Sequence, residues 1–187
     1  MTKIIGIAAV ARSGKDTVAS ILLKHKGVTT YALADPLKIG CQILFGLTNE
    51  ETWHDDLKEK IIPDWGWSPR KFFQTVGTDW LRALNSDHWL LRANLTFNQH
   101  ETNKPNDTPL DLTNPKAPFK LAAQAIFGIT QEEAWNPSLL NKKIMYWDMT
   151  PNEMIDFLKD HTLREFSNYN LLISKRPLTL PSRELPT

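Results

Sequence analysis

The 187-residue sequence is poor in the features that mark several classes of protein. It has one cysteine, Cys41, so an internal disulfide is excluded, and we expect a reducing cytoplasm as its location. Its 22 basic and 21 acidic residues leave a formal charge of +1, which argues against a long nucleic acid as the partner. The longest apolar run, residues 4–11, is far shorter than the ~18 residues of a membrane-spanning helix, and the five histidines lack metal-binding spacing.

The composition that is present, 41% apolar and 23% charged residues, is that of a folded globular protein. Residues 3–11 form an apolar run, a polar loop follows, and residues from 17 onward show helical spacing. Because both faces of the run are apolar, we expect a central strand of a parallel sheet. A second strand is expected at 28–34, and helices at 36–45, 49–60, 69–84 and 87–97. The fold class predicted is α/β, with a small parallel sheet flanked by helices.

The second half of the chain repeats part of the first. Residues 45–74 match residues 127–156 at an offset of 82 without a gap, and a weaker match extends upstream. The shared residues include helix caps, Thr48 and Thr130, and four tryptophans that we interpret as core anchors: Trp53, Trp65, Trp135 and Trp147. We interpret this as duplication of one helical element, and call the two segments copy one and copy two. Residues 98–118, rich in proline, are expected to connect them.

The loop after the first expected strand, residues 9–17, is similar to the phosphate-binding pattern G-x-x-x-x-G-K-[ST], with Gly14 and Lys15 in place. It departs from the pattern at the first position, which is Ala9, and by Asp16 inserted before Thr17. Backbone N–H groups and a helix N-terminus can surround an anion, and Lys15 can reach terminal phosphates. Asp16 or Thr17 would supply an oxygen ligand for Mg²⁺. Two simpler interpretations stay open: Asp16 only caps the helix, or the segment is an ordinary turn between a strand and a helix.

Several segments, taken together, resemble the deoxynucleoside monophosphate kinases of tailed bacteriophages. The segments that carry the resemblance are ARSGKDT (11–17), YALADPLK (31–38), FGL (45–47), DLKEK (56–60), SPRKFFQTVGTDWLR (68–82) and DHWLLRA (87–93). They occur in the family's order over about the first half of the chain.

This resemblance implies a P-loop kinase fold that transfers the γ-phosphoryl group of ATP to a deoxynucleoside monophosphate, with Mg²⁺ as cofactor. It implies that ATP contacts Ala11, Arg12, Ser13, Gly14, Lys15, Asp16 and Thr17, with Asp16 and Thr17 nearest the metal. It also implies that the acceptor lies among Asp35, Lys38, Arg70, Gln74, Thr78 and Arg82. A chain encoded by a bacteriophage would act in the host cytoplasm, and a homodimer is one option for its assembly.

Phosphoryl transfer needs fixed cations around two phosphate groups, and Arg12, Lys15 and Arg70 are the catalytic candidates. Arg70 stands at the start of an expected helix, where its planar guanidinium can bind a monophosphate. Copy two has Asn152 in place of Arg70 and Asp156 in place of Gln74, so we interpret copy two as a scaffold, lid or interface. We therefore divide the chain into a P-loop core with acceptor helices, 1–98, and a linker, helical repeat of 30–98 and tail, 99–187, packed on the same domain.

The family has a later strand that ends in a motif with an aspartate and an arginine, and this chain has no such motif. Residues 171–174 are expected to form a late strand, with Lys175 or Arg176 in place of the basic group. The alternative function is therefore a nucleotide-binding protein that derives from such a kinase, lacks activity and acts through contacts with other proteins.

Lys15→Ala tests the phosphate-binding loop. Loss of the charge contact to the β- and γ-phosphates should lower ATP affinity or turnover by at least ~10-fold. Titration with ATP and a turnover assay on the folded variant measure this effect. Unchanged binding and turnover would remove the loop from the mechanism.

Overall fold

The computed structural model describes residues 3–10, 13–99, 110–176 and 178, and the chain divides into two compact units at Ala32 and Leu33. Both copies of the repeat belong to the second unit, and the expected connection at 98–118 lies largely outside the described residues. In the described part of the chain, no helix combines the length and the apolar character that crossing a membrane requires.

The N-terminal unit contains one helix, α1 (Lys15–Leu22), preceded by Gly14 with a φ of 85°. Such a left-handed conformation is open to glycine at little cost, so the chain can turn sharply into the helix. The apolar run at 3–10 has no regular secondary structure and pairs with no other segment among the described residues.

The prediction of a parallel-sheet α/β fold is wrong. No described residue belongs to a strand beyond two isolated bridges, so the described residues of the expected strands at 3–11, 28–34 and 171–174 form no sheet. A strand requires a neighbouring backbone to satisfy its N–H and C=O groups. The described chain after residue 33 satisfies these groups within helices and turns, so no partner strands arise.

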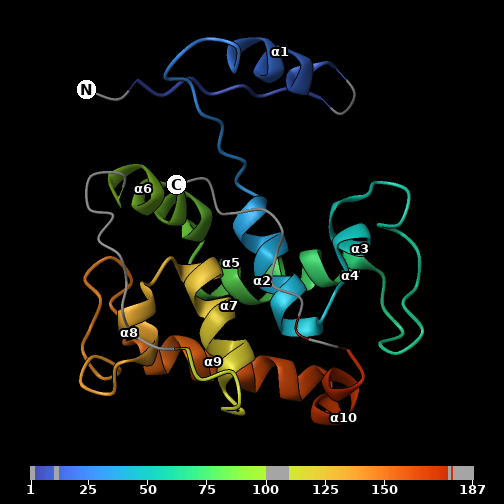
Figure 1. Cartoon of the computed structure of the whole chain (residues 1–187), viewed down its shortest axis with the longest axis vertical. Helices are drawn as coiled ribbons and strands as arrows, with labels where there is room; N and C mark the ends of the chain where they lie inside the picture. Colours follow the sequence, from blue (N-terminus) through green and yellow to red (C-terminus); the bar gives the residue numbers. More distant parts are fainter. Residues whose placement is uncertain (1–2, 11–12, 100–109, 177, 179–187) are drawn as a thin grey trace. The chain divides into compact units, whose positions relative to one another are not determined.

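The second unit is helical, and its elements occur twice in the same order (Figure 1). Because the repeat of helices extends beyond the matched segments, copy one is taken from here on as residues 35–99 and copy two as residues 117–174. Copy one forms α2 (Asp35–Phe45), α3 (Asn49–Trp53), α4 (Pro69–Gln74), the π-helical turn η1 (Thr75–Trp80), α5 (Leu81–Leu84) and α6 (His88–Gln99). Copy two forms α7 (Ala117–Phe127), α8 (Gln131–Trp135), α9 (Pro151–Glu165) and α10 (Tyr169–Ser174).

Matching local signals begin and end the equivalent helices. α2 and α7 each have 11 residues and end at a glycine with positive φ, Gly46 at 57° and Gly128 at 73°. α3 and α8 each begin at a threonine whose hydroxyl accepts a backbone N–H, while a glutamate three residues later accepts the threonine N–H. The same residues in sequence therefore specify the same local structure in both copies.

Two expected elements differ from the structure. The helix expected at 49–60 ends at Trp53, where His54 takes an extended conformation. The equivalent helix in copy two ends before Pro137, which disfavours helical geometry at the preceding residue. Residues 171–174 lie inside α10, and Arg176 after it bonds to Glu51 and Asp64. Arg176 therefore fixes the end of α10 to copy one.

The two copies pack mainly through α2 and α7, which lie side by side (Figure 1). The helices approach closely at Gly40, where an added Cβ would lie 2.4 Å from the Ile126 side chain. Phe45 at the end of α2 contacts the rings of Phe72 and Phe166, and Trp65 joins this cluster. Trp65, Trp135 and Trp147 are buried, as the core-anchor interpretation requires, whereas Trp53 is only partly buried and packs against the core.

Each copy also bonds to the end of the other copy's central helix. The His88 Nε2 lies 3.1 Å from the Ile126 carbonyl oxygen of α7, and the Tyr169 hydroxyl donates to the Leu44 carbonyl of α2 at 2.7 Å. Ile126 and Leu44 are equivalent in the repeat, and His88 and Tyr169 each begin the last helix of their copy. The copies are therefore joined by a reciprocal pair of buried hydrogen bonds.

His88 has to stay neutral in this position. Because the carbonyl can only accept, Nε2 carries the proton, while Nδ1 is buried without a hydrogen-bond partner. Burial lowers the pKa of His88 to about 4. The unfolded chain, with a histidine pKa of ~6.5, therefore binds this proton more readily than the folded chain does.

Replacement of His88 by glutamine should remove a pH dependence of stability. Between pH 7.5 and pH 5 the native histidine should lower the free energy of unfolding by about 2 kcal/mol, because only the unfolded state gains the proton. Glutamine keeps an N–H for the carbonyl but does not titrate. Urea denaturation of both proteins at the two pH values measures the difference, and identical pH dependence in both would show that folding does not lower the pKa of His88.

Candidate acceptor site

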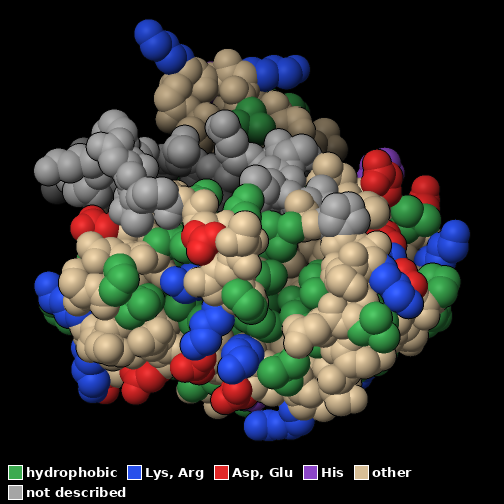
Figure 2. Space-filling model, turned by 60° about the horizontal axis from the view of Figure 1, so that its bottom comes forward, with side chains coloured by type: hydrophobic (Ala, Val, Ile, Leu, Met, Phe, Trp, Pro, Cys, Tyr) green, Lys and Arg blue, Asp and Glu red, His purple; other side chains and the backbone are tan. Residues whose placement is uncertain are grey.

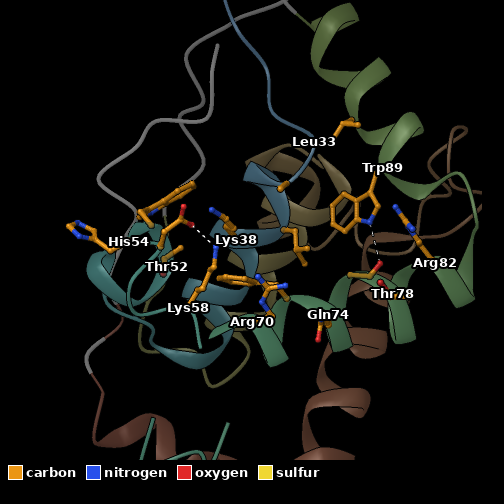
Figure 3. Close-up of a pocket in the computed structure, with 16 residues that line it drawn as sticks. Leu33, Lys38, Thr52, His54, Lys58, Arg70, Gln74, Thr78, Arg82 and Trp89 are labelled. Carbon is orange, nitrogen blue, oxygen red and sulfur yellow. Dashed lines mark hydrogen bonds and ion pairs between the residues drawn. The ribbon is translucent and has the colours of Figure 1, made fainter. Parts of the chain in front are cut away.

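One pocket of about 470 Å³ lies in the second unit, within the range of small-ligand sites. We call it the copy-one pocket. The start of α2, the turn after α3, the helix from Pro69 to Leu84 and the first turn of α6 form its walls (Figure 3). Its lining residues are Leu33, Ala34, Leu37, Lys38, Thr52, Trp53, His54, Asp55, Lys58, Arg70, Phe73, Gln74, Gly77, Thr78, Arg82 and Trp89.

The pocket is rich in positive charge. Lys38, Lys58, Arg70 and Arg82 line it, against one carboxylate, Asp55. Figure 3 shows Arg82 beside the Trp89 ring, on the opposite side of the pocket from the other three cations. An anionic ligand is therefore favoured, although the chain as a whole is nearly neutral. Figure 2 agrees with that overall balance, because acidic and basic side chains are interspersed over the face it draws.

Neighbouring groups orient three of the cations. The Lys38 ammonium lies 5.0 Å from the centre of the Trp53 ring, and the Lys58 ammonium bonds to Asp55 at 3.2 Å. Arg70 forms an ion pair with Glu59, and the side chains are about half exposed. Exposed pairs of this kind contribute little stability, so a phosphate can compete for Arg70 at low cost. Among the described residues, no carboxylate forms an ion pair with Arg82.

The rest of the wall is apolar and aromatic. Trp53, Phe73 and Trp89 present rings, and Leu37 adds an aliphatic surface. Aromatic faces can stack on a nucleobase, while the cations can bind phosphate. The pocket therefore combines the two surfaces that a nucleoside monophosphate requires.

Five of the six residues predicted to surround the acceptor line this pocket: Lys38, Arg70, Gln74, Thr78 and Arg82. Asp35 does not. It is half-buried in the first turn of α2, beside the lining residue Ala34.

The residues predicted to bind ATP belong to the N-terminal unit. Ser13 donates through its N–H and hydroxyl to the Val10 carbonyl, and the Lys15 ammonium contacts the Asp16 carboxylate at 2.6 Å. Thr17 lies in the first turn of α1. Ala11 and Arg12 lie outside the described residues. The structure describes no cluster of three or more histidine, cysteine or acidic side chains that could hold a metal by themselves.

Sequence reasoning missed Lys58 and Trp89, although both lie in segments that carry the family resemblance. The repeat held a signal for Lys58, because its equivalent in copy two is Leu140. Arg70, which the family resemblance had named, likewise loses its charge in copy two, where the equivalent residue is Asn152. Arg70 and Asn152 each donate their backbone N–H to the equivalent residue, Lys58 or Leu140, at 2.9 and 3.0 Å. The backbone is therefore preserved where the charge is not.

Copy two keeps the frame of the pocket but changes its polar groups. The Lys120 ammonium lies 4.7 Å from the centre of the Trp135 ring, as Lys38 lies over Trp53. Lys116 bonds to Asp156 at 3.0 Å, at the positions of Ala34 and Gln74 in copy one.

A neutral hydrogen bond from Asn152 to Asn141 replaces the Arg70–Glu59 ion pair of copy one. Copy two therefore keeps the cation over its tryptophan, Lys120, but has neutral residues, Asn152 and Leu140, where copy one has Arg70 and Lys58.

Comparison with known proteins finds similarity over part of the chain. Residues 3–61 match the sequence model of a family described as "Deoxynucleotide monophosphate kinase". A "Putative deoxynucleotide monophosphate kinase" of Acanthamoeba polyphaga mimivirus is 42% identical over 82 residues, which cover 42% of this chain and 42% of that protein. No solved structure matches significantly.

The chain thus spans well under half of the relative's length in this match, and the relative comes from a virus that is not a bacteriophage. The family match includes the phosphate-binding loop, Lys38 and Lys58, while Arg70 and the lining residues after it lie beyond residue 61. The resemblance predicted from the sequence is confirmed, and residues 3–61 of the chain match the deoxynucleotide monophosphate kinase family.

Proposed function

We propose that the protein transfers the γ-phosphoryl group of ATP to a deoxynucleoside monophosphate, which binds in the copy-one pocket. The observation that carries the proposal is the convergence of Lys38 from α2 with Arg70 and Arg82 from the two ends of the helix at 69–84 on one aromatic-walled cavity. Such a cavity can neutralise a dianion and cover a base.

Each group has a role in this proposal. Arg70 presents a planar pair of donors to the acceptor phosphate, and Lys38 and Lys58 add charge beside it. Thr78 and Gln74 offer hydrogen bonds to the sugar or base. Phosphoryl transfer gains most from such positioning and charge stabilisation.

The donor nucleotide is assigned to residues 11–17. Among these residues, the N-terminus of α1, the Lys15 ammonium and the hydroxyls of Ser13 and Thr17 fit a polyphosphate. Asp16, with a side chain 90% exposed, and Thr17 offer the hard oxygen atoms that Mg²⁺ prefers. Bound Mg²⁺ would supply charge neutralisation of the transferring phosphoryl group.

One observation favours a second candidate, a nucleotide-binding protein without turnover. Neither of the two residues considered as replacements for the family's later arginine, Lys175 and Arg176, lines the pocket, and Arg176 bonds to Glu51 and Asp64. The copy-one pocket would then bind a nucleotide, and the protein would act through contacts with other proteins.

A coupled assay of ADP release with each of the four deoxynucleoside monophosphates separates the two candidates. Release that depends on the acceptor supports the kinase. Binding of ATP and of a monophosphate without such release supports the binding protein, and absence of monophosphate binding contradicts both.

The repeat supplies a matched pair of variants for the pocket. Arg70→Ala should weaken binding of the monophosphate by ~1.5 to 3 kcal/mol, the usual effect of removing a hydrogen bond to a charged group. Asn152→Ala, at the equivalent position of copy two, should change binding by less than about 0.5 kcal/mol. Isothermal titration measures both, and equal losses would mean that copy two contains a second site.

A further inference from the structure

The helix that bears Arg70 contains a π-helical turn that its copy-two equivalent lacks. The stretch from Pro69 to Leu84 is interrupted by η1, whereas α9 is α-helical from Pro151 to Glu165. At the end of η1, the Leu81 N–H donates to the Val76 carbonyl, five residues back. In an α-helix, the Leu81 N–H would bond to the Gly77 carbonyl.

The π-helical turn accommodates one additional residue. Before the turn, the residue numbers of equivalent positions in the two copies differ by 82, as for Pro69 and Pro151. After it they differ by 81, because α6 begins at His88 and α10 begins at Tyr169. Turns of this kind arise where one residue is inserted into a helix, and they occur often at functional sites. The insertion changes the direction of the side chains that follow, including Arg82.

Trp89 bonds to the Gly77 carbonyl, the one that the Leu81 N–H would bond to in an α-helix. Its indole N–H donates to Gly77 O at 3.2 Å, and its ring is 9% exposed and lines the copy-one pocket. The equivalent residue in copy two, one position after Tyr169, is the exposed Asn170. Gly77 also fits closely against α2, since an added Cβ would lie 2.7 Å from Leu37 Cδ2. Copy two has Lys159 at that position.

The same helix connects this bond to copy two. Trp89 follows His88, whose ring bonds to the Ile126 carbonyl of α7. Arg92, one turn later, donates to the Ala125 carbonyl at 2.9 Å. Copy two therefore holds α6, and α6 holds the π-helical turn through Trp89.

We propose that Trp89 is a positioning residue: by its bond to Gly77 O it maintains the π-helical turn that directs Thr78 and Arg82 into the copy-one pocket. The expected effect of Trp89 on acceptor binding rests on the proposed function. The expected effect of Trp89 on the conformation of the π-helical turn does not, because it concerns the protein without ligand.

Trp89→Phe removes the N–H and keeps an aromatic ring. Trp147→Phe is the matched control, because the Trp147 indole donates to the Phe127 carbonyl at 2.9 Å, is 8% exposed and lies outside the pocket. Both variants lose one buried hydrogen bond, so similar shifts of the melting temperature are expected. Only Trp89→Phe should weaken binding of the monophosphate, by about fivefold, the scale of one hydrogen bond.

A double-mutant cycle with Arg82→Ala distinguishes positioning from general loss of structure. If Trp89 acts through the turn, Trp89→Phe should weaken binding much less in the Arg82→Ala background than in the native background. Additive losses would mean that Trp89 affects the ligand independently of Arg82, and would overturn the inference.

A measurement without ligand separates this inference from the proposed function. In amide NMR spectra, Trp89→Phe should shift the signals of Thr78 and Arg82 and reduce the hydrogen-exchange protection of Leu81, and Trp147→Phe should not. Unchanged signals would overturn the inference even if the monophosphate binds. Shifted signals in a protein that binds no monophosphate would contradict the proposed function and leave the positioning of the turn supported.

Discussion

Two buried hydrogen bonds to backbone carbonyls, one in each direction between the copies, constrain the rest of the second unit. The last carbonyls of α2 and α7 have no partner inside their own helices, and each receives a donor from the other copy: Tyr169 for Leu44 and His88 for Ile126. A buried carbonyl left without a donor would cost more than the bond itself contributes. Neither copy can therefore satisfy its central helix alone, and the close approach at Gly40 holds the pair together.

Through these hydrogen bonds, copy two supports the copy-one pocket, and we assign no ligand site to copy two itself. Copy two supplies the carbonyls that hold α6, and α6 supplies Trp89 to the copy-one pocket. The same frame in copy two carries Asn152 where copy one carries Arg70. Because capping and packing residues specify the frame, polar residues at its surface could change in one copy without loss of the fold. We therefore interpret copy two as a scaffold, one of the roles considered from its sequence.

Local signals predicted much of the helical unit. Helical spacing predicted helices at 36–45 and 69–84, and the threonine caps marked the starts of α3 and α8. The family resemblance named Arg70 and Gln74, and comparison of the copies then showed that both differ in copy two. The expected strands failed, because an apolar run such as 3–10 indicates burial but does not identify a partner strand. The π-helical turn and the role of Trp89 could not be predicted, because they depend on a contact between two helices. An ungapped alignment also conceals the single inserted residue.

The most direct test of the division between the copies is an amide NMR titration of the whole chain with the four deoxynucleoside monophosphates in turn. The account predicts that at least one of them shifts the signals of Lys38, Arg70 and Thr78, while the copy-two equivalents Lys120, Asn152 and Asp160 stay in place. Shifts of similar size in both sets would contradict the account, as would shifts confined to copy two or no shifts with any monophosphate.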